Sequence, residues 1–333
     1  MMINNLFHKF FILSNLINLS IIPLFLHDLL MMWFLMEINN FLFICYLCMK
    51  LNNKKIIFLY YMIQIIASLL MVFSLITNNF FLFNVNFFMI NFYFSLMIKL
   101  SIPPFHLWMP LISLYLNWNI MFILLTFQKF IPLYMMSIIK INILIFYYLI
   151  LSSAFISSFK MINSLNFKIL MSYSSINQTS WMLFLIIFKN LFWLIYMIIY
   201  SLILFIILFS FSFFKLSFNF MLNNYSSMNF NLMLLMLIFN LASIPPLSFF
   251  MFKWMNIFIM IFNSKLNVML IIMMIINSFI LIYIYINMMI LIMFFYSIKS
   301  KFLKFSINLM NKNFFFIVLI FLNFFFSFFL ILI

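Results

Sequence analysis

Residues 98–108 read Ile-Lys-Leu-Ser-Ile-Pro-Pro-Phe-His-Leu-Trp, and the rest of the chain is interpreted from them. A lysine, two prolines and a histidine stand inside an otherwise apolar segment. Hydrocarbon cannot hydrate an ammonium group, and adjacent prolines remove two backbone donors from a helix. A similar stretch, Ala-Ser-Ile-Pro-Pro at 242–246, precedes Lys253 and Trp254. Two interrupted hydrophobic segments with lysines predict a site that moves charge across a membrane.

The composition is that of a polytopic membrane protein. Of 333 residues, 70% are hydrophobic and 6% are charged. Because one spanning helix needs about 20 apolar residues, the chain has room for roughly ten to twelve spans and no soluble domain. The formal charge of +15 comes from lysines scattered between apolar runs. They form no basic face, so we expect no nucleic-acid partner.

The residue usage points to an organelle gene. The chain has no Gly and no Arg, whereas Phe (55) and Met (32) are abundant. The favoured residues have codons rich in A and T, and the excess of Met fits a code in which ATA also means Met, as in animal mitochondria. Without glycine, helices cannot pack through glycine seams and must rely on Ser, Ala, Phe and Met.

The apolar runs predict an all-α fold with about eleven transmembrane helices in a single integral membrane domain, 1–333. The expected spans are 6–24, 26–48, 56–77, 87–116, 119–138, 141–159, 168–188, 191–213, 232–262, 267–296 and 314–333. Connections are expected at 217–231 and 299–313. The fourth and ninth spans are discontinuous and cross in opposite directions, which predicts inverted-topology repeats over roughly 26–138 and 141–296, followed by a C-terminal helix at 314–333.

The loop lysines predict the orientation. One side of the membrane carries Lys9, Lys50, Lys54, Lys55, Lys160, Lys168, Lys215, Lys299, Lys301, Lys304 and Lys312. The other side carries Lys140, Lys189 and Lys265. The positive-inside rule then places the N-terminus in the matrix and the C-terminus in the intermembrane space. The first span is expected to be retained, because no cleavage site is evident after it.

The remaining lysines, Lys99, Lys129 and Lys253, fall within spans, as does Glu37. Each such charge costs about 2.5–3.5 kcal/mol on insertion scales. Burial favours the neutral form of each group, whereas a Glu beside a Lys stabilises the ionised pair. A lysine near this balance can load and release protons, and coupled groups titrate as a set. These four residues therefore predict a proton path in which Glu37 pairs with Lys99. Asp28, at a span end, is expected to be interfacial.

Three further features allow two interpretations each. His106 lies seven residues after Lys99, about two turns on if the helix were unbroken, and either relays protons or is structural. The polar run 172–180 either lines water or marks a helix entry. Cys45 and Cys48 are expected to be buried inert thiols, the alternative being a metal or redox pair. The chain has no haem, iron–sulfur or phosphate-binding motif, so neither a metal nor a cofactor is expected on it.

At these residues the sequence resembles the family of subunit 2 of mitochondrial NADH:ubiquinone oxidoreductase (complex I), which is antiporter-like and pumps protons. The matching stretches are Met36–Asn39, Gln64 with Ala67 and Ser68, Lys99–Trp108, Thr126–Lys129, Tyr173–Asn177 with Trp181, and Pro245–Trp254. The resemblance implies a proton-transfer axis of Glu37, Lys99, Lys129 and Lys253, with His106 beside the first interruption.

The same resemblance implies a core subunit of a proton-translocating enzyme of the mitochondrial inner membrane. NADH, FMN, the iron–sulfur clusters and ubiquinone are expected on other subunits. The expected partners are other membrane-arm subunits and phospholipids such as cardiolipin. A stand-alone cation/proton antiporter of the same fold is the alternative, although it would be expected to carry more mid-membrane carboxylates than Glu37 alone. A passive membrane scaffold is a third interpretation.

The sequence departs from the family pattern at several positions. Leu59 stands where a lysine is common, which argues against an accessory proton step there, and Gln178 replaces a histidine. Ser101 and Ser243 stand where glycine is usual. Serine should stiffen the interruptions, and its hydroxyl can bond the freed carbonyls.

Overall fold

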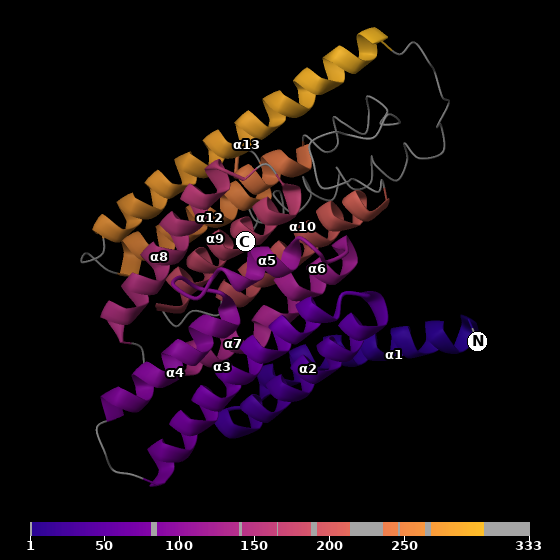
Figure 1. The fold of residues 1–333 in the computed structure, drawn as a ribbon. Coiled ribbons are helices and arrows are strands. Elements are labelled where there is room, and N and C mark those ends of the chain that lie inside the picture. Colours follow the sequence, from indigo (N-terminus) through magenta and orange to yellow (C-terminus); the bar gives the residue numbers. More distant parts are fainter. Residues whose placement is uncertain are drawn as a thin grey trace. The chain divides into compact units, whose positions relative to one another are not determined.

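The computed structural model describes residues 2–80, 85–139, 142–164, 166–187, 192–213, 236–245, 247–263 and 268–302. Helices joined by turns make up these residues, and no strand occurs among them (Figure 1). The chain divides into two compact units, residues 1–153 with 182–191, and residues 154–181 with 192–333.

The first unit gathers the helices that carry Glu37, Lys99 and Lys129. They are α1 (Met2–Ile21), η1 (Ile22–Phe25), α2 (Leu29–Lys50), α3 (Lys54–Phe80), α4 (Val85–Leu100), α5 (Trp108–Ser113), α6 (Trp118–Leu125), α7 (Phe127–Ile138) and residues 143–153 of α8 (Ile143–Ile162). Helix α3 lies against α2 and α4. Helix α7 contacts α1, α2 and α4, so the helix that bears Lys129 touches the helices of Glu37 and Lys99.

The second unit contains the C-terminal part of α8, residues 167–181 of α9 (Phe167–Ile187), and α10 (Phe192–Phe213). Residues 236–242 are also helical, and α12 (Ser248–Asn263) and α13 (Val268–Phe302) follow. The Asn177 amide links two of these helices, since it donates to the Ala154 carbonyl at 3.1 Å and to the Ser157 hydroxyl at 3.2 Å. Helix α12 packs against α13.

Most predicted spans coincide with helices to within a few residues. The predicted span 119–138 matches the apolar span Trp118–Ile138, but it contains a discontinuity that was not expected: Thr126, at φ −115° and ψ −80°, separates α6 from α7. One expected boundary is wrong. Helix α13 continues to Phe302, so the expected connection at 299–313 begins too early. No proline stands in α13 to end it sooner. The expected connection 217–231 and the expected span 314–333 lie outside the described residues.

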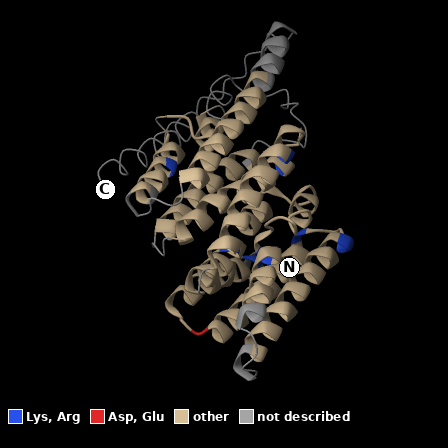
Figure 2. Cartoon of the chain, turned by 90° about the vertical axis from the view of Figure 1, so that its left-hand side faces the viewer, with Lys and Arg blue, Asp and Glu red and all other residues tan. Residues whose placement is uncertain are grey.

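The surface chemistry of the described helices is that of a membrane protein. Six of these helices are long and apolar enough to cross a bilayer, among them Phe192–Ser212. Charged residues are rare along the ribbon (Figure 2). Large apolar side chains such as Phe25 and Leu144 are 80% and 78% exposed. Exposed apolar area on this scale suits lipid rather than water, which confirms the polytopic helical class.

The two interruptions, here called the first break (101–107) and the second break (243–247), begin with the same turn. Ser101 N donates to Ile98 O at 3.2 Å, and Ile102 N donates to Met97 O at 2.9 Å. In the second break, Ser243 N donates to Asn240 O at 2.9 Å, and Ile244 N donates to Phe239 O at 3.4 Å. This hydrogen-bond pair defines a Schellman helix end, in which the residue after the cap takes the left-handed conformation.

Serine occupies that left-handed position in both breaks. Ser101 has φ 56° and Ser243 has φ 59°, and both side chains are buried. A side chain at positive φ costs about 1–2 kcal/mol, which glycine avoids. Each hydroxyl donates at 2.5 Å to the carbonyl of the preceding residue, Leu100 or Ala242. The expectation that serine hydroxyls bond freed carbonyls is confirmed.

The left-handed turn makes position 101 sensitive to side-chain shape. Ser101→Val places a β-branched side chain at positive φ in a fully buried site, whereas Ser101→Gly keeps the turn. We expect the valine variant to be about 1–2 kcal/mol less stable than the glycine variant. The stability difference is read from the temperature at which half of the protein aggregates in a detergent extract, which should be lower for the valine variant. Equal temperatures for the two variants would contradict the assigned turn.

Candidate functional site

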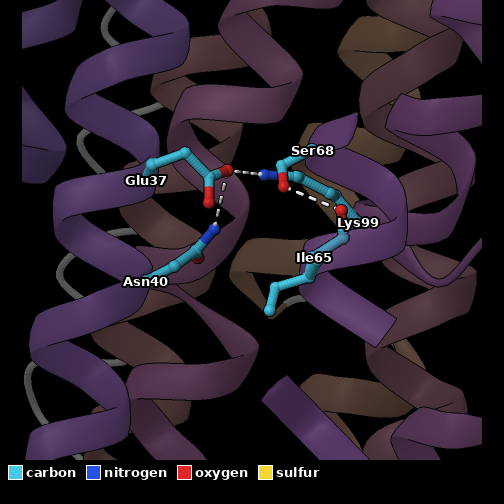
Figure 3. A network of polar contacts seen from close by, with 5 residues as sticks. All are labelled: Glu37, Asn40, Ile65, Ser68 and Lys99. Atoms are coloured by element: carbon cyan, nitrogen blue, oxygen red, sulfur yellow. Dashed lines mark hydrogen bonds and ion pairs between the residues drawn. The ribbon is translucent and has the colours of Figure 1, made fainter. Parts of the chain in front are cut away.

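Glu37 and Lys99 form an ion pair between α2 and α4. Lys99 Nζ lies 2.5 Å from Glu37 Oε1, and the side chains are 2% and 27% exposed respectively (Figure 3). Asn40, one helical turn after Glu37, donates its amide to the same oxygen at 3.5 Å. Lys99 stands in the last turn of α4, where the helix dipole attracts a cation. The pair predicted from sequence is therefore present and is supported by the helix end.

Lys99 and Lys129 line one small cavity in the first unit. Its volume is about 10 Å³, close to the space that a single water needs. Besides the two lysines, its polar lining comes from Asn40, Tyr60, Gln64 and Gln128. Amide and phenol groups can hydrogen-bond water. The structure therefore brings two of the predicted lysines to a shared polar space.

Lys129 lies in the first turn of α7, at the end opposite to that which holds Lys99 in α4. The side chain is 1% exposed. Its backbone N donates to Thr126 O at 2.9 Å, directly after the discontinuity between α6 and α7. The N-terminal end of a helix dipole repels a cation, whereas the C-terminal end attracts one. The two lysines that share the cavity therefore stand in contrasting electrostatic positions.

Lys253 stands in the second unit, on α12, just after the second break. It is 4% exposed, and its Nζ donates to Ser243 Oγ at 2.7 Å. The same Nζ lies 5.4 Å from the centre of the Trp181 ring, within the range of a cation–π contact. Asn240 completes this break, because its Oδ1 accepts from Ser248 Oγ at 3.1 Å and from Phe249 N at 3.3 Å.

His106 lies in the first break rather than on a helix. Helix α4 ends at Leu100, so the two-turn spacing from Lys99 does not apply. The ring Nδ1 is 3.3 Å from Pro104 O within the same turn, and the residue is buried. Trp108 closes the turn, since its Nε1 donates to Ile98 O at 3.0 Å.

The polar run 172–180 lies inside α9, beginning at its sixth residue, so it does not mark a helix entry. Its serine and threonine hydroxyls bond carbonyls three residues earlier, as Ser175 does to Ser172 O at 2.6 Å. Gln178 Oε1 accepts from the Tyr196 hydroxyl. These side chains are buried.

Three smaller expectations have clear outcomes. Asp28 is exposed at the start of α2, which confirms its place at a span end. Cys45 and Cys48 are free thiols, but Cys48 is exposed and Cys45 is half-buried, so the prediction of buried thiols is wrong. Their apolar helix α2 presents one face outward, and helical spacing puts both cysteines toward it. Lys168, expected in a loop, is buried in the first turn of α9.

Sequence reasoning missed several partners of the charged residues. Asn40 could have been found from its spacing of three from Glu37, which places both side chains on one helix face. Trp181 stood out only as a match to the family and Ser243 only as a departure from it, and no local pattern joins either residue to Lys253. Their contacts depend on how the chain folds back after the second break. No group of three or more potential metal-ligating side chains occurs among the described residues.

The Glu37–Lys99 pair makes a double-mutant cycle informative. Glu37→Gln or Lys99→Met alone leaves the other group without its charged partner, whereas the double variant removes both charges. We expect the double variant to be less destabilised than the sum of the single variants by about 0.5–3 kcal/mol. The stability of the wild type, the two single variants and the double variant is compared through their aggregation temperatures in detergent. The exposed Asp28→Asn serves as the control, and additive single effects would contradict the pair.

Comparison with known proteins places the chain in a family. No family model matches the sequence. NADH-ubiquinone oxidoreductase chain 2 of Anopheles gambiae is 30% identical over 269 residues, 76% of this chain and 76% of the relative. The protein of the same name from Apis mellifera ligustica is 30% identical over 278 residues, 78% of each chain.

The fold also has a counterpart among solved structures. A chain of respiratory complex I from Thermus thermophilus matches with a TM-score of 0.76 at 14% identity, over 86% of this chain and 70% of that chain. That likeness confirms the fold expected from the resemblance. Identity of 30% across more than three quarters of both chains identifies this protein as a member of the NADH-ubiquinone oxidoreductase chain 2 family.

Proposed function

We propose that this chain is a proton-translocating membrane-arm subunit of respiratory complex I, and that Glu37, Lys99, Lys129 and Lys253 carry the protons. The observation that carries the proposal is the cavity shared by Lys99 and Lys129, next to the Glu37–Lys99 ion pair. Electrons pass from NADH to ubiquinone on other subunits, which hold the FMN and iron–sulfur clusters, and this chain has no redox centre.

The ion pair is the switch of the proposed mechanism. While Glu37 contacts Lys99, the carboxylate holds the ammonium charge in place. Glu37 also borders a groove of about 240 Å³, lined by apolar side chains together with Asn40, Tyr61 and Gln64. A charge or a structural change at this groove weakens the pair. Lys99 then gives its proton through water in the shared cavity to Lys129.

Lys129 is suited to receive the proton only for a short time. It lies at the N-terminal end of α7, where the helix dipole opposes a cation, so a proton taken up there is readily passed on. Lys253 is proposed to be the next residue to carry the proton, as the family resemblance implies. His106 is proposed as an accessory proton-transfer group beside the first break.

The chain is proposed to consist of two repeats, roughly 26–138 and 141–296, with a C-terminal helix at 314–333. The matching turns at Ser101 and Ser243, with the same backbone hydrogen bonds and the same following Ile-Pro-Pro sequence, support the repeats. The lysines differ in register, because Lys99 precedes its break and Lys253 follows its break. Both nonetheless stand beside a break, where the helix no longer satisfies its own carbonyl groups.

The proposed location is the mitochondrial inner membrane, with other complex I membrane subunits and phospholipids such as cardiolipin as neighbours. Family membership favours this assignment over a stand-alone cation/proton antiporter. The acidic residues of the whole sequence number 2, and one of them is the exposed Asp28, so a cation pathway lined by several carboxylates is not available.

Removing the amine of Lys129 tests the proposed path. Lys129→Met keeps an apolar side chain of similar length, so we expect the complex to assemble. Proton pumping per NADH oxidised should fall at least about tenfold, because positioned proton-transfer groups contribute about a hundredfold or more. NADH oxidation should remain in part. The exposed Lys55→Met serves as the control, and normal pumping in Lys129→Met would refute the role of this lysine.

The orientation gives a separate prediction. Asn52 lies in the exposed turn between α2 and α3, next to several lysines. A cysteine at position 52, with Cys45 and Cys48 changed to Ser, should react with a membrane-impermeant maleimide only from the matrix side, because of the positive-inside rule. The reagent should therefore label inverted inner-membrane vesicles, which expose the matrix face. Labelling instead in mitochondria from which only the outer membrane has been removed, which expose the intermembrane-space face, would contradict the proposed orientation.

A further inference from the structure

We propose that Ser243 is a positioning residue for Lys253, holding the amine of this lysine at the second break through its side-chain hydroxyl. The inference rests on the proposed function, since it assumes that Lys253 carries protons. It assigns a chemical role to the serine side chain. For the left-handed backbone turn alone, glycine would be the less strained residue.

The hydroxyl of Ser243 has its proton committed to the backbone. It donates to Ala242 O at 2.5 Å and accepts from Lys253 Nζ at 2.7 Å. A hydroxyl has one proton and two acceptor lone pairs, so in this arrangement it faces the lysine only as an acceptor. Its bond to the carbonyl polarises it and strengthens its accepting side. The lysine amine is thereby fixed at the end of the interrupted helix.

The second unit contains no acidic side chain that could take this role. The sequence has 2 acidic residues, Asp28 and Glu37, and both lie in the first unit. Lys253 and Ser243 are 4% and 2% exposed. Among the residues of the second unit that the structure describes, the Lys253 amine contacts the Ser243 hydroxyl and the face of the Trp181 ring. The hydroxyl dipole of Ser243 and the ring of Trp181 therefore stabilise the Lys253 amine, as the carboxylate of Glu37 stabilises the Lys99 amine.

The first break provides a matched comparison within the same chain. Ser101 has the same left-handed backbone, and its hydroxyl bonds the preceding carbonyl in the same way. Its other neighbour, however, is Met109 Sδ at 3.0 Å. Lys253 follows Ser243 by ten residues, whereas the residue ten positions after Ser101 is Leu111. The two serines thus share the backbone role, and Ser243 alone of the two contacts a lysine.

Glycine substitutions separate the two roles without straining the turn. Ser243→Gly and Ser101→Gly both keep the left-handed conformation, which glycine adopts freely. In inner-membrane vesicles that contain the assembled complex, we expect Ser243→Gly to lower proton pumping per NADH oxidised by roughly tenfold or more, because a hydrogen bond to a charged group is lost. Ser101→Gly should leave pumping unchanged.

A third variant distinguishes the hydroxyl contact from a packing effect. Asparagine also tolerates the left-handed conformation and carries an acceptor oxygen, so Ser243→Asn should restore pumping relative to Ser243→Gly. Normal pumping in Ser243→Gly, or equal losses in Ser243→Gly and Ser101→Gly, would overturn the proposal. A loss in Ser243→Gly that Ser243→Asn does not restore would overturn it as well.

Lys253→Met shows which proposal fails. If Lys253→Met pumps normally, the role of Lys253 in the proposed function is refuted, and the inference about Ser243 falls with it. If Lys253→Met stops pumping while Ser243→Gly pumps normally, only the inference about Ser243 is refuted. The amount of assembled complex, read from native gels, is compared for all four variants so that the pumping values refer to equal amounts.

Discussion

An ammonium group inside a membrane protein must be solvated by the protein itself, and this constraint explains where the polar residues of the chain lie. Three lysines meet it in three ways. Lys99 has a carboxylate and a helix C-terminus. Lys129 borders a small cavity with amide and phenol groups. Lys253 has a serine hydroxyl and an aromatic ring. Because each solution has a different strength, neighbouring lysines need not hold a proton equally well, and such differences are what directional transfer needs.

The helix breaks supply part of this solvation, and the chain builds them without glycine. The left-handed helix end that usually requires glycine is formed twice by serine, at the cost of backbone strain. The hydroxyl partly compensates, because it bonds a backbone carbonyl beside it. At Ser243 the same atom also contacts a lysine, so a residue that looks like a simple replacement for glycine contributes to the charged site.

Much of the fold could be predicted because membrane helices are long and apolar and end where polar residues or prolines occur. The interruption at Thr126 was missed, since threonine and its neighbours are ordinary helix residues and no proline or glycine marks this position. The helical spacing between Lys99 and His106, which would hold only in an unbroken helix, does not apply because α4 ends at Leu100, before the prolines. The ion pair of Glu37 and Lys99 was predicted correctly, since the one carboxylate that falls within a span among buried lysines has few other partners.

By itself, the sequence determined the membrane class, the helical fold and the identity of the buried charged residues, because hydrocarbon makes each charge costly enough to be conspicuous in the chain. Only the tertiary structure decided which groups meet these charges. The shared cavity of Lys99 and Lys129, and the contact between Ser243 and Lys253, join residues 30 and 10 positions apart across changes of chain direction. Helical or strand periodicity predicts contacts only within one regular element, so these contacts follow from how the elements pack.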